Sequence, residues 1–169
     1  KLFSLYLYKF LGICKFFMIC RKITLSYMEY FLGKKMNLVT VFGGSGFLGR
    51  YIVRQLASKG YFIRVITRNP NEALFLRVYG KVGQIQLLSG DIKEEKKLGD
   101  YIRDSDCVIN CVATFFETRS QSFKNLHVIA ARNLAKESKN QGVNQFIHIS
   151  SLGASYESSS RLLQSKGAG

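Results

Sequence analysis

Three glycines at regular spacing follow an apolar run, and their spacing is suited to binding an anion. Residues 39–49 read Val-Thr-Val-Phe-Gly-Gly-Ser-Gly-Phe-Leu-Gly, which is a G-x-x-G-x-x-G pattern. Gly43 permits a sharp turn out of a strand, Gly46 leaves backbone amides open to a pyrophosphate, and Gly49 lets the next helix pack closely. The alternative is a plain glycine turn. We expect a dinucleotide to bind at Gly43, Gly44, Ser45, Gly46, Phe47, Leu48 and Gly49.

Thr67 and Arg68 end the next apolar run, about 20 residues beyond the glycines, where a dinucleotide site selects its cofactor. An NAD site usually has an Asp or Glu here, which accepts a hydrogen bond from the ribose 2′-hydroxyl. Arg68 can instead make two charge-assisted hydrogen bonds to a 2′-phosphate, and Thr67 can donate a third. The sequence therefore predicts NADP(H) over NAD(H). The alternative is that Arg68 is a solvated loop cation.

Two further pairs of residues follow apolar runs and are candidates for cofactor contacts. Asp91 and Ile92 follow the third run, and Asp91 can accept a hydrogen bond from an adenine amino group or cap a helix. Val112 and Ala113 follow the fourth run, where small side chains let the backbone pass close to the adenosine ribose. We expect both pairs to line the cofactor site.

These candidates need a scaffold of alternating strands and helices, and the apolar pattern predicts one. Alternation with short loops predicts an open, doubly wound parallel sheet, an α/β fold of the Rossmann type. The glycine turn then lies at the carboxyl edge of the first strand, where such sheets bind ligands. Strands are expected over 37–42, 61–67, 84–89, 106–112 and 144–150, and helices over 47–59, 71–79, 94–103, 122–140 and 158–166.

Charge and cysteine content narrow the range of partners. The net charge of +14 suits a phosphate-rich cofactor, and without a recognition module we do not expect nucleic acid as a partner. Four cysteines and two histidines show no zinc spacing, so no metal is expected. Cys107 and Cys111 would stand about 13 Å apart along a strand, too far for a disulfide. A reduced, cytoplasmic protein is expected.

Residues 1–35 differ in composition from the rest of the chain. They are rich in Phe, Tyr, Leu, Ile and Lys, but their longest uncharged run is residues 2–8. That run is too short for a transmembrane span, and no signal-peptide cleavage site is clear. We favour translation starting at Met36, with residues 1–35 not being native coding sequence. The alternative is an interfacial anchor that holds a nucleotide-binding domain, residues 36–169, peripherally on the inner membrane.

Several runs together resemble the atypical short-chain dehydrogenase/reductase superfamily. They are Val-Phe-Gly-Gly-Ser-Gly-Phe-Leu-Gly-Arg at 41–50, Thr-Arg-Asn-Pro at 67–70, Gly-Asp-Ile at 90–92, Asn-Cys-Val-Ala at 110–113 and Phe-Ile-His-Ile-Ser-Ser-Leu-Gly-Ala at 146–154. The likeness covers about residues 36–169 and is strongest to the NAD(P)H-binding accessory subunits of respiratory complex I and their bacterial relatives. It implies a Rossmann core, truncated here before a C-terminal lobe, and an NADPH held for structure or assembly.

The same resemblance implies a catalytic pair that this chain carries only in part. The superfamily's reaction uses Tyr-x-x-x-Lys on the helix after the fifth strand, where the lysine holds the nicotinamide ribose and lowers the tyrosine pKa. Lys166 matches the lysine, but Leu162 stands where the tyrosine should be and has no proton to transfer. A sequence error at 162 is the alternative. The serine that polarises the substrate corresponds to Ser150 or Ser151, although either could cap a turn.

The sequence thus predicts an NADP(H)-binding module that works within a respiratory NADH:quinone oxidoreductase-like complex, with other subunits as partners. One alternative is an NADP-dependent reductase, dehydratase or sugar-nucleotide epimerase acting on a small carbonyl substrate. Another is a nucleotide-sensing regulator. We interpret His127 and His148 as packed histidines rather than catalytic bases.

Overall fold

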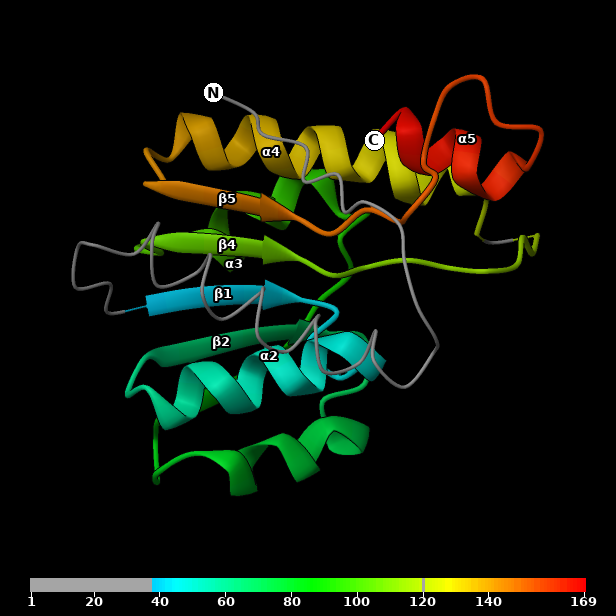
Figure 1. The fold of residues 1–169 in the computed structure, drawn as a ribbon. Coiled ribbons are helices and arrows are strands. Elements are labelled where there is room, and N and C mark those ends of the chain that lie inside the picture. The colour runs from blue at the N-terminus through cyan, green and yellow to red at the C-terminus, as the bar shows by residue number, and fades with distance from the viewer. Residues whose placement is uncertain (1–37, 120) are drawn as a thin grey trace. The chain divides into compact units, whose positions relative to one another are not determined.

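The computed structural model describes residues 38–119 and 121–169, so the predictions for residues 1–35, Met36, Cys14 and Cys20 lie outside the described residues. Five strands form one parallel sheet in the order β3-β2-β1-β4-β5 (Figure 1). The strand order reverses direction between β1 and β4, which confirms the predicted doubly wound sheet. The strands are β1 Leu38–Phe42, β2 Phe62–Thr67, β3 Ile85–Ser89, β4 Cys107–Asn110 and β5 Gln145–His148.

The helices connect successive strands and cover the sheet. α2 packs on β1 and β2, and α4 packs on β5 (Figure 1). The helices are α2 Phe47–Ser58, η1 Asn71–Tyr79, η2 Glu95–Lys97, α3 Leu98–Ile102, η3 Lys124–Ala130, α4 Ala131–Asn140 and α5 Arg161–Gly167.

Several elements differ in detail from the prediction. The helix predicted over 94–103 is η2 followed by α3, and β5 ends at His148 rather than at residue 150. η1 is a 3-10 helix, which starts with the Ala73 amide donating to the Pro70 carbonyl three residues earlier. The predicted helix over 122–140 begins as the π-helix η3 and continues as α4. β4 ends at Asn110 because the Val112 amide bonds the Asn110 side chain, 3.0 Å away, and so leaves the ladder.

Apolar side chains fill both faces of the sheet. On one face Phe42 and Val108 pack with Leu98 of α3 and with Leu126 and Leu134 of the η3–α4 helix. On the other face, to which Val39 and Val41 point by strand alternation, the buried residues of α2 include Val53 and Leu56. The sheet is therefore buried on both sides, and its carboxyl edge is left for the site.

Candidate functional site

The glycine turn joins β1 to α2 and is as tight as the spacing predicts. Gly43 has φ +75°, and the Gly46 amide donates to the Gly43 carbonyl at 3.1 Å. A Cβ on Gly49 would overlap the Gly43 carbonyl oxygen and stand 2.7 Å from the Gly44 Cα. Gly46 is the N-cap of α2, and no side chain caps that helix. The first turn of α2 is therefore open to an anion.

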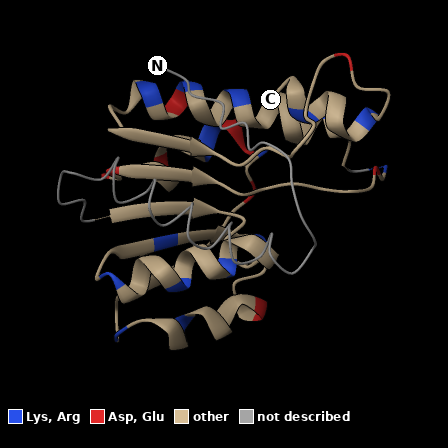
Figure 2. Cartoon of the chain, viewed as in Figure 1, with Lys and Arg blue, Asp and Glu red and all other residues tan. Residues whose placement is uncertain are grey.

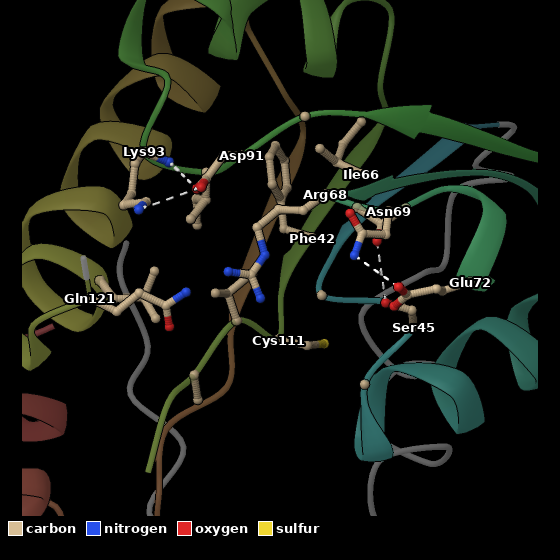
Figure 3. Close-up of a pocket in the computed structure, with 18 of the residues that line it drawn as sticks. Phe42, Ser45, Ile66, Arg68, Asn69, Glu72, Asp91, Lys93, Cys111 and Gln121 are labelled. Carbon is tan, nitrogen blue, oxygen red and sulfur yellow. Dashed lines mark hydrogen bonds and ion pairs between the residues drawn. The ribbon is translucent and has the colours of Figure 1, made fainter. Parts of the chain in front are cut away.

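A cavity of about 340 Å³ opens beside this turn, at the carboxyl ends of β1 to β4 (Figure 3). Its size is in the range of ligand sites. The structure brings together there Gly43, Ser45, Gly46, Thr67, Arg68, Asp91, Ile92, Val112 and Ala113.

Five other predicted cofactor residues do not line the cavity. Gly44 packs against Val65, Gly49 packs against the turn, and Leu48 is half-buried on α2. Phe47 is exposed at the start of α2. Lys166 is the fifth, and it lies on α5.

Arg68 places a positive charge within the cavity, and it forms no hydrogen bond or ion pair with any of the described residues. Figure 3 shows its guanidinium between the Asp91–Lys93 pair and the side chains of Asn69 and Glu72. The hydroxyls of Ser45 and Thr67 lie 3.5 Å apart across the turn. A charged guanidinium and two hydroxyls are thus available to an anionic ligand.

A carboxylate that the sequence patterns did not indicate, Glu72, also lines this cavity. Glu72 belongs to the first turn of η1, and its Oε1 accepts a hydrogen bond from Asn69 Nδ2 at 3.1 Å. Phe75, Lys93 and Gln121 line the cavity as well and were not indicated either. The signal for Glu72 lay one helical turn beyond Arg68, on a helix that begins at the same sheet edge.

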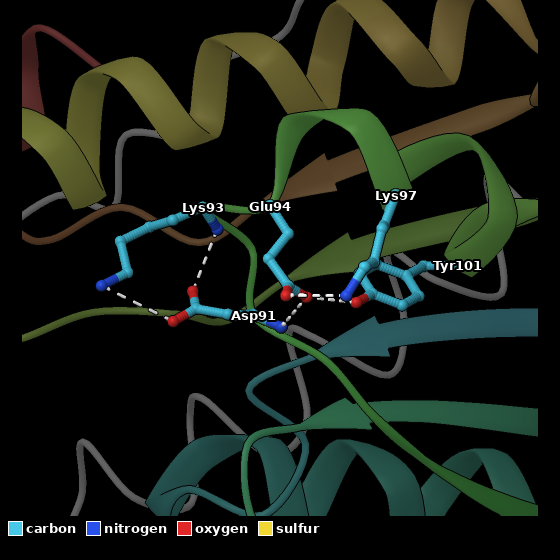
Figure 4. Close-up of polar contacts among 5 residues, drawn as sticks. All are labelled: Asp91, Lys93, Glu94, Lys97 and Tyr101. Atoms are coloured by element: carbon cyan, nitrogen blue, oxygen red, sulfur yellow. Dashed lines mark hydrogen bonds and ion pairs between the residues drawn. The ribbon is translucent and has the colours of Figure 1, made fainter.

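Asp91 lines the cavity but is also held by its own loop (Figure 4). Its Oδ1 accepts from the Lys93 amide at 2.9 Å, and its Oδ2 stands 3.6 Å from Lys93 Nζ. Because these local bonds use the carboxylate, the adenine contact of Asp91 stays a prediction.

Glu94 anchors the same loop to α3 (Figure 4). It accepts hydrogen bonds from the Tyr101 hydroxyl, from Lys97 Nζ and from the Asp91 amide. These bonds lower the pKa of Glu94 to about 2, and burial together with Glu94 raises the pKa of Tyr101 to about 12. The Tyr101 ring leaves no room for a side chain at Gly90, whose Cβ would stand 2.6 Å from a ring carbon.

The predicted catalytic residues lie on and beside α5, away from the cavity lining. Lys166 is only 7% exposed, and its Nζ stands 3.5 Å from the Ile149 carbonyl oxygen. Burial lowers the pKa of Lys166. Ser150 Oγ donates to the Lys166 carbonyl at 3.3 Å, whereas Ser151 is exposed. Leu162 precedes Lys166 by one turn of α5.

His127 ties α5 to the loop after β4. It is 1% exposed, and its Nε2 accepts from the Thr114 amide at 3.0 Å. With Nε2 as acceptor, we assign the proton to Nδ1, which donates to Ser165 Oγ at 2.8 Å. Ser165 Oγ in turn donates to the Leu162 carbonyl. Burial, helped by Lys166, lowers the pKa of His127 to about 4 and keeps it neutral.

His148 and the thiols of Cys107 and Cys111, on or beside β4 and β5, are also held in their neutral forms. His148 Nδ1 accepts from Asn110 Nδ2 at 3.1 Å, and burial lowers the pKa of His148 to about 4. Burial raises the pKa of the free thiols Cys107 and Cys111 to about 12. None of these groups is poised to exchange a proton near pH 7.

The sheet order, the glycine turn and the cavity together define a nucleotide-binding Rossmann domain. Residues 39–166 match the NAD dependent epimerase/dehydratase family. The chain therefore belongs to that family, and a nicotinamide dinucleotide is the cofactor class of the site.

Particular relatives are subunits of a respiratory enzyme. The chain is 38% identical over 133 residues to NADH dehydrogenase (ubiquinone) 1 alpha subcomplex subunit 9, mitochondrial, of Mus musculus, with 78% of this chain and 35% of the relative covered. It is 39% identical to the protein of that name from Dictyostelium discoideum, with 78% and 37% covered. The chain thus spans about a third of the length of these curated relatives.

A likeness to solved structures supports the fold. A mutated uronate dehydrogenase superimposes with a TM-score of 0.62 at 18% identity, over 79% of this chain and 51% of that one. Within the described residues, no helix has the length and apolar character needed to cross a membrane.

Proposed function

We propose that this chain is the nucleotide-binding part of an accessory subunit in a respiratory NADH:quinone oxidoreductase-like complex, where it holds NADP(H) for structure and assembly. The names of its relatives, which are mitochondrial subunits of such an enzyme, support this proposal. The chain would then work as a peripheral component at the membrane that carries the complex. The cytoplasmic location stays a prediction.

The position of Lys166 carries the proposal that the cofactor is retained rather than turned over. Its Nζ lies at the Ile149 carbonyl and not in the cavity lining, and one turn earlier Leu162 offers no proton. Proton transfer by a placed side chain accelerates a reaction about 10²–10⁴-fold, so its loss leaves little turnover. A bound nicotinamide would supply hydride chemistry, but these residues supply no acid to complete it.

The open first turn of α2 fits a pyrophosphate, and we assign that role to residues 43–49. Asp91 and Ile92 would face the adenine, and Val112 and Ala113 the adenosine ribose. Neither Lys166 nor Ser151 lines the cavity, and the catalytic roles that the family resemblance implies for them stay predictions.

The choice of NADP(H) rests on Arg68. Its guanidinium lies in the cavity and pairs with no described residue, whereas Glu72 is already hydrogen-bonded by Asn69. A 2′-phosphate would satisfy Arg68 with a bidentate contact. A 2′-hydroxyl would instead favour Glu72 as its acceptor. Arg68 therefore favours NADP(H), whereas Glu72 favours NAD(H).

Calorimetric titration of the purified protein with NADPH and NADH tests this choice. Arg68→Ala should weaken NADPH binding about 10- to 100-fold, the value of a charged hydrogen bond, and leave NADH unchanged. Glu72→Gln should leave NADPH binding equal or tighter. Arg77→Ala, on the outer side of η1, is the matched control. Equal affinity of the wild type for both cofactors, unchanged in Arg68→Ala, would refute the assignment.

Native gel electrophoresis tests the assembly role. The wild-type protein should migrate with the NADH:quinone oxidoreductase in its source organism, and it should oxidise NADPH negligibly with a panel of small carbonyl compounds. Steady turnover with any member of the panel would favour the reductase alternative.

A further inference from the structure

Basic residues are unevenly distributed along the described part of the chain. Residues 47–81 contain seven basic residues and one acidic residue, whereas residues 82–169 contain eleven and nine. Figure 2 shows basic segments along both α2 and η1, and the acidic residue is Glu72 in the first turn of η1. Charge is therefore nearly balanced elsewhere, and the surplus lies on the α2–β2–η1 side of the sheet.

Aromatic rings hold two of these cations in place. Arg50 Cζ lies 5.8 Å from the centre of the Phe75 ring, and Arg54 Cζ lies 5.9 Å from that of Tyr79. The two rings meet edge to face at 6.4 Å. Each cation–π contact stabilises an exposed guanidinium by about 0.5–1 kcal/mol. These contacts favour the conformations in which Arg50 and Arg54 lie over the rings.

Aliphatic side chains are exposed beside these arginines. Val78 is 80% exposed and Leu74 is 46% exposed, and Arg77 is exposed between them on η1. We define the α2–η1 face as Arg50, Arg54, Leu74, Phe75, Arg77, Val78 and Tyr79. Arginine and aromatic residues are enriched at the centres of protein interfaces.

We propose that the α2–η1 face docks onto an acidic surface of a partner protein. Its guanidiniums would pair with carboxylates in the bidentate geometry that arginine favours, and Val78 and Leu74 would pack between the pairs. Arginines that lie over aromatic rings, with the exposed Leu74 and Val78 between them, favour a protein over an anionic bilayer, which binds lysine-rich helices with broad apolar faces. The proposal deepens the proposed function, because the partner would be a neighbouring subunit of the respiratory assembly.

Site-specific cross-linking tests the proposal. The photoreactive amino acid p-benzoylphenylalanine replaces Val78, and the protein is irradiated in its source organism. We expect a cross-link to one acidic peptide of a respiratory subunit, identified by mass spectrometry. The double variant Arg54→Glu, Arg77→Glu should reduce its yield at least 10-fold. The control Arg132→Glu, Lys136→Glu makes the same charge change on exposed positions of α4 and should leave the yield unchanged.

The outcomes separate this proposal from the proposed function. NADPH affinity and thermal unfolding are measured for each variant. Both should match the wild type, because neither charge-reversed pair lines the cofactor cavity. If the wild type migrates with the complex and the Arg54, Arg77 variant does so equally well, the docking surface is wrong and the assembly role stands. If the cross-link forms on an acidic protein outside the complex, docking stands and the assembly role fails. Cross-linking to phospholipid alone would overturn the docking proposal.

Discussion

Gly46 and Gly49 stand three residues apart in the glycine turn. Alanine at Gly49 should lower the stability of the fold, whereas alanine at Gly46 should lower the affinity for the cofactor. A Cβ on Gly49 would overlap the Gly43 carbonyl and approach the Gly44 Cα at 2.7 Å. These are backbone atoms, so no rotamer change relieves the overlap, and overpacking of this kind costs about 3 kcal/mol. Alanine gains about 1 kcal/mol over glycine within a helix. Gly49→Ala should therefore lower the free energy of unfolding by about 2 kcal/mol.

Gly46→Ala should leave stability nearly intact but weaken cofactor binding. The residue has φ −71° and ψ 177°, which alanine adopts freely, and its Cβ would meet only the Gly43 carbonyl oxygen, at 3.3 Å. The added methyl group would occupy the approach of the pyrophosphate to the open amides. Loss of one charged hydrogen bond is worth about 1.5–3 kcal/mol, so the dissociation constant for NADPH should rise roughly 10- to 100-fold.

Urea unfolding and calorimetric titration with NADPH on the same preparations measure both effects. Gly60→Ala is the control: this residue has φ +85°, and its Cβ would meet nothing within 4 Å. It should cost about 1–2 kcal/mol in stability, the price of left-handed backbone for alanine, and leave affinity unchanged. Wild-type NADPH affinity in Gly46→Ala would show that the pyrophosphate does not lie on the turn. Wild-type stability in Gly49→Ala would refute the close packing of α2.

Three other outcomes are expected. Because the pKa of His127 is about 4 in the folded protein against 6.5 in model compounds, the unfolded chain takes up protons first, and stability should fall as pH decreases from 6.5 to 4. His148, whose pKa is also about 4, contributes equally, so His127→Gln should reduce that slope by about half in urea unfolding. Leu162→Tyr alone should not create NADPH turnover with carbonyl compounds, since Lys166 Nζ lies outside the cavity lining, and turnover in this variant would contradict the observed placement. Tyr101→Phe should destabilise the fold and raise the pKa of Glu94 from about 2 toward 4.5 in an NMR titration; an unchanged pKa would refute the hydrogen bond as its cause.

The strands and helices of the sheet could be predicted from the sequence because each one depends on the pattern of neighbouring residues. The apolar runs placed all five strands, and the doubly wound order followed from alternation and crossover handedness. Arg68 was found for the same reason, since the end of β2 lies at a fixed place beside the glycine turn.

Contacts between side chains that are far apart in the sequence could not be predicted from local patterns. His127 was interpreted as a packed histidine, but only the folded chain shows that it bonds both Thr114 and Ser165, the latter 38 residues after His127. Glu94 likewise meets Tyr101 only because α3 folds back over the loop after β3. No spacing rule specifies such pairs.

By itself the sequence determined the family, the sheet and the anion-binding turn, because periodicity and glycine spacing act on neighbouring residues. Only the tertiary structure decided that Glu72 shares the cavity with Arg68, that Lys166 is buried at the Ile149 carbonyl, and that arginines and rings interleave between α2 and η1. Those arrangements depend on how helices pack across the sheet, and packing is set by the shapes of side chains far apart in the chain.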